Sequence, residues 1–299
     1  MPIHSRSFAV IMGTVVLLFV AGCAPVKQLR VATVALTLRD VADAAGKQSS
    51  PRVIREGTPA YLMLLDGLLE AEPRSRELLL AACRAYVSYA SSLVGQGNPE
   101  EVSVLFFRGR DFGFRALSES LQTNFKEASS GTLDGFAAVL AKCGKKDVPA
   151  LFWTTNAWAN WIALNTSKVE ALGDLPMLEA AMKRTLELDE TYFYGGPHVI
   201  RGIYLASKPA VLGGNPAQAK VHFDRARELS GDKNLVLKVY LAEYYARSVG
   251  DRELYRRSLE EVLAAPLEEG SDMTLSNVMA KEKARWLLDK TEEYFEPER

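Results

Sequence analysis

The chain has 299 residues, with 36 Lys and Arg against 37 Asp and Glu, and a formal net charge of −1 at pH 7. This balance provides no basic surface, and it argues against binding to nucleic acid or to an anionic membrane surface. Beyond the first 23 residues no apolar run reaches the 18 residues needed to cross a bilayer. We therefore expect a water-soluble body that is joined to a membrane only at its start.

The first residues are typical of an export signal. An apolar run from Phe8 to Val20 follows Arg6 and is too short to span a bilayer. It leads into Val20-Ala21-Gly22-Cys23, which resembles the lipobox of bacterial lipoproteins. The resemblance implies that residues 1–22 are removed and that Cys23 is acylated, and two or more acyl chains give stable anchoring. Ala24 follows instead of aspartate, which favours the outer membrane of a two-membrane bacterium. A plain secretory signal with a chance cysteine is the alternative.

The rest of the chain has helical periodicity almost from end to end and lacks the alternation typical of strands. We therefore predict an all-α fold, with a lipidated tether and one short helix in residues 23–50 and a helical domain in residues 51–299. The predicted helices cover, in chain order, residues 58–71, 74–94, 99–125, 132–143, 148–166, 174–188, 197–212, 216–229, 235–248, 252–265 and 275–294.

Capping residues predict where several of these helices start. Thr58-Pro59 and Asn98-Pro99 each combine an N-cap side chain with a proline in the first turn. Asp174 is predicted to cap the helix that runs to residue 188. Glu72-Pro73 breaks the chain between the first two helices.

The chain also contains an internal repeat. Gly97-Asn98-Pro99 recurs as Gly214-Asn215-Pro216, and the residues that follow align without gaps. Related glycine turns recur at intervals of roughly 36 to 41 residues, a period typical of stacked helical hairpins such as tetratricopeptide repeats. We therefore predict a solenoid of antiparallel helix hairpins with degenerate tetratricopeptide-like repeats. The aligned pairs are Phe106 with Phe223, Arg108 with Arg225, and Arg110 with Arg227.

One repeat helix has a clear packing pattern. Ala219 and Ala226 are small residues that let the paired helix approach, and Phe223 fills the gap between them. The tryptophan and tyrosine usual in the first helix of a tetratricopeptide repeat are missing there, so the match to the repeat is degenerate.

Few residues suited to catalysis or metal binding remain. His198 and His222, the two histidines beyond the export signal, are too few for the usual histidine-rich metal site. The common motifs of nucleophilic, zinc-dependent and phosphate-binding enzymes do not occur. We therefore expect no enzyme activity, no cofactor and no metal.

Cys83 and Cys143 are the two cysteines that lipidation would not use. In an oxidising compartment they could form one disulfide. Two buried free thiols fit equally well, because the sequence does not show whether their Cα atoms come within bridging range.

Three tryptophans on the predicted helix 148–166 are candidates for a ligand cavity. Trp153 and Trp161 share one face of this helix, whereas Trp158 points well away from it. A helix with large aromatic side chains on both sides is either central in the stack or lines a cavity, and both interpretations stay open.

A second candidate cluster surrounds Gly195-Gly196. Tyr194, His198 and Arg201 lie there near the start of a predicted helix. Such a group of side chains could bind an anion or a carboxylate, or it could be an irregular joint between two repeats.

Four stretches together resemble the TatT family, tetratricopeptide-like lipoproteins that accompany some tripartite (TRAP) transporters. They are Arg55 to Ala60, Leu78 to Tyr89, Asp147 to Trp153 and Gly195 to Gly214. The last stretch contains Gly-Gly-Pro-His, Arg-Gly-Ile-Tyr and Pro-Ala-Val-Leu-Gly-Gly. The likeness extends over nearly all of the chain beyond the export signal.

The resemblance implies an all-helical periplasmic lipoprotein that forms a homotrimer around a pore and docks a TRAP-type periplasmic solute-binding protein. The cargo would be small and hydrophobic or carboxylated, and an aromatic cavity around Trp153, Trp158 and Trp161 would suit it. The alternative function is a peptide-binding tetratricopeptide scaffold for outer-membrane or cell-wall assembly.

Overall fold

The computed structural model describes residues 37, 38, 40–95 and 97–295. Residues 1–42 and 43–299 form two separate units, and the architecture below is that of the second. The predicted export signal, the acylated Cys23 and the sorting residue Ala24 lie outside the described residues.

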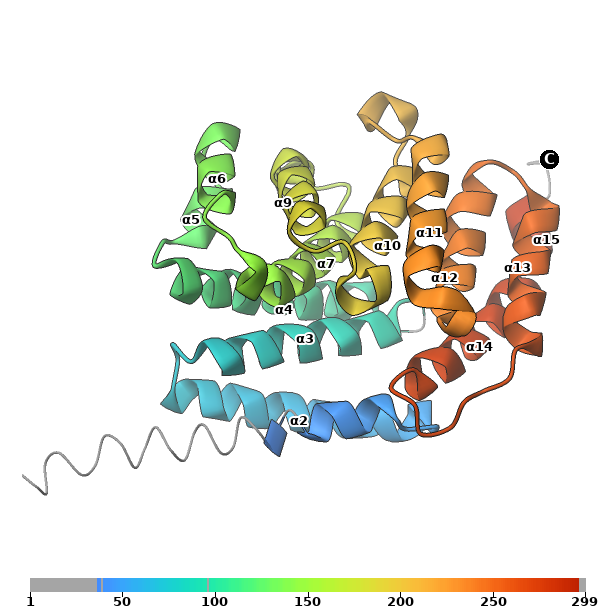
Figure 1. Cartoon of the computed structure of the whole chain (residues 1–299), viewed down its shortest axis with the longest axis horizontal. Coiled ribbons are helices and arrows are strands. Elements are labelled where there is room, and N and C mark those ends of the chain that lie inside the picture. Colours follow the sequence, from blue (N-terminus) through green and yellow to red (C-terminus); the bar gives the residue numbers. More distant parts are fainter. Residues whose placement is uncertain (1–36, 39, 96, 296–299) are drawn as a thin grey trace, which may run out of the picture. The chain divides into compact units, whose positions relative to one another are not determined.

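Every regular element of the described residues is helical, which confirms the predicted all-α class (Figure 1). Besides α-helices, the described residues contain three short 3-10 helices, Lys145–Asp147, Ala210–Leu212 and Gly231–Lys233, and one π-helix, Leu241–Ala246. Among the helices described, none combines the length and the apolar character that a bilayer crossing requires. The α-helices are α2 Pro51–Ala71, α3 Arg76–Leu93, α4 Pro99–Leu121, α5 Phe125–Ser129, α6 Leu133–Leu140, α7 Val148–Leu164, α8 Val169–Gly173, α9 Leu175–Leu188, α10 Tyr192–Ser207, α11 Pro216–Ser230, α12 Leu235–Tyr240, α13 Arg252–Ala264, α14 Thr274–Asp289 and α15 Thr291–Phe295.

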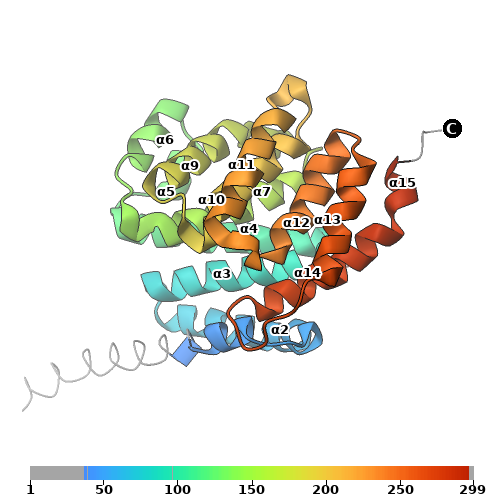
Figure 2. The ribbon, with the colours of Figure 1, turned by 45° about the vertical axis from the view of Figure 1, so that its right-hand side comes forward.

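Helices that follow one another in the chain pack side by side. Helix α3 lies between α2 and α4, and α7 packs against both α4 and α3 and also against α9 and α10 (Figures 1 and 2). Helices α10 and α11 form a close pair, and α12, α13 and α14 pack together after it. Helix α14 then reaches α2, where Arg55 Nη2 lies 2.9 Å from Glu282 Oε2.

Helix α2 begins earlier than predicted. The prediction placed its start at Thr58-Pro59, but the helix begins at Pro51, with Ser50 as its N-cap. Ser50-Pro51 has the same cap-then-proline pattern, so the earlier pair starts the helix and Pro59 lies inside it. The Thr58 hydroxyl donates a hydrogen bond to the carbonyl of Ile54 over 2.6 Å.

Helix α4 ends earlier than predicted. It was expected to reach Phe125, but Gln122 adopts a left-handed conformation with φ 51° and ψ 41° and ends the helix. Asn124 then caps α5, because its side chain accepts a hydrogen bond from the backbone N–H of Glu127.

Helices α10 and α11 approach each other closely, as the pattern of small residues predicts. Ala219 and Ala226 are fully buried, and Phe223 is 4% exposed. A Cβ added to Gly202 of α10 would lie 3.2 Å from the ring of Phe223. Glycine at this position therefore allows the two backbones to come together.

Cys83 and Cys143 are buried free thiols. Burial raises the pKa of the Cys83 thiol to about 12 and that of the Cys143 thiol to about 11. Both side chains are therefore protonated and unreactive at neutral pH, so the free-thiol interpretation of the sequence holds.

Candidate functional site at Arg110 and the histidine pair

A cavity of about 350 Å³ opens where α4, α5, α7 and α8 meet. Its lining combines aromatic rings with charged groups of both signs. The lining residues are Phe107, Arg110, Phe114, Lys126, Ser129, Ser130, Trp161, Lys168, Glu170 and Asp174.

Arg110 is the buried charge of this cavity, with a side chain that is 10% exposed. Its guanidinium carbon lies 4.4 Å from the ring centroid of Trp161 and 4.7 Å from that of Phe107. Such contacts between a cation and aromatic rings are favourable, and more so where water is excluded. Arg110 Nη1 donates to Asp174 Oδ2 over 3.0 Å, but the buried Nε has no acceptor among the described residues. Burial lowers the pKa of Arg110, although Asp174 opposes this effect.

Asp174 does not act as the predicted helix cap. It precedes α9, but its side chain makes no capping hydrogen bond. The carboxylate turns to the cavity, where Oδ2 accepts from Arg110 Nη1 and, over 2.7 Å, from Trp158 Nε1. A buried guanidinium needs an anionic partner more than an exposed helix end needs a cap, so the ion pair prevails.

The three tryptophans of α7 lie in three different surroundings. Trp161 lines the cavity and contacts Phe107, with 5.9 Å between ring centroids. Trp158 is 1% exposed and lies behind the cavity, where it packs against Phe114 and holds Asp174. Trp153 is 5% exposed and belongs to a separate aromatic cluster. A role of these residues in ligand binding stays a prediction.

That separate cluster contains a strained turn at the start of α10. Phe193 and Tyr194 have φ values of 48° and 59°, and Gly195 has φ 75°. Two consecutive non-glycine residues in the left-handed region cost on the order of 1–3 kcal/mol each and persist only where surrounding contacts hold them. The Phe193 ring lies 5.0 Å from that of Trp153, whereas Tyr194 is 41% exposed.

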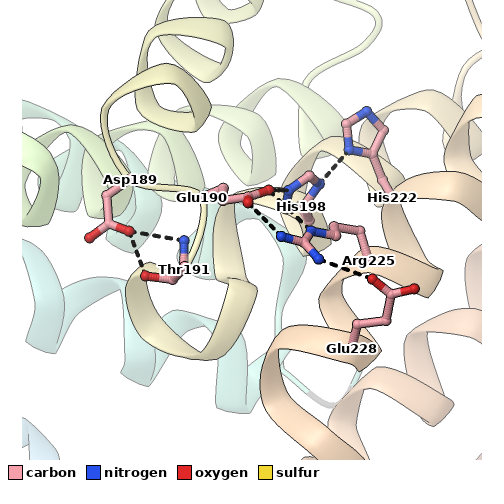
Figure 3. A network of polar contacts seen from close by, with 7 residues as sticks. All are labelled: Asp189, Glu190, Thr191, His198, His222, Arg225 and Glu228. Atoms are coloured by element: carbon pink, nitrogen blue, oxygen red, sulfur yellow. Dashed lines mark hydrogen bonds and ion pairs between the residues drawn. The ribbon is translucent and has the colours of Figure 1, made fainter.

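Next to this turn, a polar network joins α10 to α11 (Figure 3). His198 Nδ1 lies 2.8 Å from His222 Nδ1, and His198 Nε2 lies 2.8 Å from Glu190 Oε2. Arg225 Nη2 donates to Glu190 Oε1 over 2.6 Å, and Arg225 Nη1 donates to Glu228 Oε2 over 3.0 Å. Hydrogen bonds from Arg225 and His198 lower the pKa of Glu190 to about 2, so this carboxylate stays charged.

Arg201 lies in a neighbouring contact. Its Nη1 is 3.5 Å from Glu179 Oε1, an oxygen that is also 3.4 Å from Lys208 Nζ. Tyr194, His198 and Arg201 are thus close in sequence, but His198 contacts Glu190 and His222 whereas Arg201 contacts Glu179.

Sequence reasoning missed Arg110 and Asp174 as site residues. Arg110 was aligned with Arg227 in the repeat, yet Arg110 is buried and Arg227 is exposed. The local sequence does not predict which of the two arginines is buried, because the carboxylate that pairs with Arg110 lies 64 residues away.

Comparison with known proteins gives the family. The model of the family described as TRAP transporter T-component matches residues 47–295. The chain belongs to this family. A protein of Treponema pallidum (strain Nichols), described as an uncharacterized protein, is 23% identical over 258 residues, which cover 81% of this chain and 80% of the relative.

Membership of the TRAP transporter T-component family confirms the resemblance drawn from Arg55 to Gly214 and assigns the chain an accessory role in TRAP transport. The match starts at residue 47, close to the predicted start of the helical domain, and includes the cavity, the strained turn and the histidine network.

Proposed function

We propose that this T-component is a membrane-tethered periplasmic lipoprotein that docks the solute-binding protein of a TRAP uptake system. The family match over residues 47–295 carries this proposal. The sequence Val20-Ala21-Gly22-Cys23 supports the lipid tether, and Ala24 supports the outer membrane. In this proposal residues 23–50 form the tether, and residues 51–299 form a tetratricopeptide-like solenoid that assembles as a homotrimer.

The cavity at Arg110 is our proposed ligand site. Trp161 and Phe107 offer flat apolar surfaces, and Nε of Arg110 is a donor that finds no acceptor among the described residues. The lining holds Arg110, Lys126 and Lys168 against Glu170 and Asp174, so positive charge is in excess by one. These features suit a small molecule with an apolar body and a carboxylate, and such pockets usually combine apolar walls with few polar groups.

Replacing Cys23 with serine tests the tether. Serine has no thiol to be acylated, so the variant is expected to lose membrane attachment and to be released as a folded protein. Cell fractionation after osmotic release, with detection by antibody, measures this directly. A Cys83→Ser variant is the matched control and should stay with the membrane fraction. A Cys23→Ser protein that stays membrane-bound would contradict the tether.

Co-purification tests the docking partner. The protein is isolated from membranes solubilised in mild detergent, after brief chemical cross-linking, and its partners are identified by mass spectrometry. The proposal expects a TRAP-type solute-binding protein among them. Recovery of envelope-assembly factors, with no solute-binding protein, would instead favour the peptide-binding scaffold.

A further inference from the structure

Helix α2 exposes an apolar face over about three of its turns. All exposed residues of α2 between positions 57 and 67 are apolar or glycine, namely Gly57, Pro59, Ala60, Met63, Leu64 and Gly67. Met63 is 76% exposed and Leu64 is 51% exposed. Val53 and Ala71, which are also exposed, continue this face toward the two ends of the helix. We call this set of residues the outer face of α2.

The outer face of α2 has the spacing of a single helical stripe. From Gly57 through Leu64 to Ala71 its residues follow one another at intervals of three and four, as the buried side of a helix usually does. Helix α2 has a separate buried side, and its main neighbour is α3. In domains of stacked helices the outer face of an outermost helix is usually polar, because no further helix covers it. The apolar outer face of α2 departs from this rule, which indicates contact with something outside the chain. The buried side contains Leu62, Leu65 and Leu69.

Charged side chains stand at the ends of this face. Arg52 Nε lies 3.0 Å from Glu56 Oε1 at one end, and Glu70 is exposed near the other. Asp66, in between, turns away and accepts a hydrogen bond from the hydroxyl of Tyr86 over 2.7 Å. A contact over the middle of the face therefore buries no charge. An apolar stripe with charges at its margins is the pattern of helices that lie in the interface of a bilayer.

The place of α2 in the chain indicates what covers its outer face. Pro51, the first residue of α2, follows Cys23 of the proposed lipid tether by 28 residues (51 − 23). Even a fully extended chain of this length reaches no farther than about 100 Å. Acyl chains on Cys23 would therefore keep α2 close to the bilayer at all times. Such a tether makes a second contact intramolecular, so that even a weakly binding apolar face stays bound.

We propose that the outer face of α2 lies on the surface of the bilayer that holds Cys23, with the side chains of Met63 and Leu64 inserted between the lipid headgroups. This inference rests on the proposed lipid tether and adds a second contact to it. The contact is apolar, so it needs no anionic lipid, in agreement with the formal net charge of −1. Salt does not screen a contact of this kind.

This contact fixes which side of the helical domain faces the membrane. Helix α3 lies between α2 and α4 (Figures 1 and 2). With α2 on the lipid, α4 lies on the side of α3 that points away from the bilayer. The Arg110 cavity, which α4 helps to line, is then on that side as well. The lipid surface therefore orients the domain and leaves the cavity uncovered.

Spin labels on the full acylated protein test the contact. Gly67→Cys places a nitroxide in the middle of the outer face, where an added Cβ meets nothing within 4 Å. Val221→Cys, at a position of α11 that is 66% exposed, is the matched control. Cys83 and Cys143 are buried and escape labelling, and acylation blocks Cys23. The protein is bound to vesicles of phosphatidylcholine and phosphatidylethanolamine. Electron paramagnetic resonance then measures collisions of each label with oxygen, which enters lipid, and with a water-soluble nickel chelate.

On vesicles, the label at position 67 is expected to collide with the nickel chelate about fivefold less often than the label at position 221, and more often with oxygen. Raising the salt concentration to about 0.5 M should leave this difference in place. Adding Met63→Glu and Leu64→Glu to Gly67→Cys should return the label to water, while the acyl chains keep the protein on the vesicle. Val221→Glu added to Gly67→Cys is the control, and it should leave the label in the lipid. If the double glutamate variant does not fold, the two labels decide alone.

Three other outcomes would overturn the proposal. Equal access of the nickel chelate to the labels at positions 67 and 221 in vesicle-bound protein would refute the contact of α2 and leave the lipid tether standing. A label at position 67 that loses collisions with both oxygen and the chelate would show that a second protein molecule, and not lipid, covers the face. Protein that does not bind the vesicles at all would contradict the tether and the α2 contact together.

Discussion

Replacing Gly113 with alanine is expected to destabilise the protein by about 2–3 kcal/mol, because the added methyl overpacks the core. Gly113 lies on α4 where this helix meets α3 and α7. Its Cβ would lie 2.0 Å from Thr154 Oγ1, 3.0 Å from Thr154 Cβ and 3.1 Å from Cys83 Sγ. Thr154 is 1% exposed and its hydroxyl donates to the carbonyl of Ala150, so rotating the hydroxyl away would break this hydrogen bond. Urea unfolding followed by tryptophan fluorescence measures the loss.

Gly67→Ala is the matched control for this prediction. Gly67 lies inside α2, and a Cβ there would meet nothing within 4 Å. Alanine should therefore stabilise the helix by up to about 1 kcal/mol through its higher helix propensity. If Gly113→Ala and Gly67→Ala changed the free energy of unfolding equally, the close approach of α4 to α3 and α7 would not depend on glycine at position 113.

Replacing Asp174 with alanine should have the largest effect at the cavity, a loss of about 3 kcal/mol, since breaking a buried ion pair leaves a charge without a partner. The substitution removes the acceptor of both Arg110 Nη1 and Trp158 Nε1. Arg110 would then be buried among aromatic rings, and no other carboxylate of the described residues forms an ion pair with it. The same urea unfolding experiment reports the change.

Two further variants separate this charge effect from a simple loss of contacts. Arg110→Met in the Asp174→Ala background removes the unpaired charge, and it should restore most of the lost stability. Asp111→Ala breaks the exposed pair of Asp111 with Lys126 nearby, and it should cost less than about 1 kcal/mol. A double variant no more stable than Asp174→Ala alone would contradict the account of the buried pair.

Local rules predicted most of the helices because their signals are local. Asn98-Pro99 and Asn215-Pro216 start α4 and α11 where the sequence places them. The errors arose where two equal signals compete or where the backbone adopts an unusual conformation. Ser50-Pro51 precedes Thr58-Pro59 in the chain and starts α2, so Thr58 and Pro59 lie inside the helix. Gln122 ends α4 in a left-handed conformation, which glycine and asparagine adopt more often than glutamine.

The candidate site was harder to predict, because tertiary contacts define it. Helical periodicity placed Trp158 and Trp161 on different faces of the helix. It could not show that the Asp174 carboxylate would accept hydrogen bonds from both Trp158 and Arg110. The contact of His198 with His222 links positions 24 residues apart on two helices. An isolated sequence gives the residue types of such networks, and only the packing of α10 on α11 brings them together.

Sedimentation velocity of the purified protein mixed with the solute-binding protein of its TRAP system tests the central claim most directly. The proposed docking predicts a single faster boundary that contains both proteins at micromolar concentration. Two boundaries that sediment as each protein does alone would contradict the proposed function.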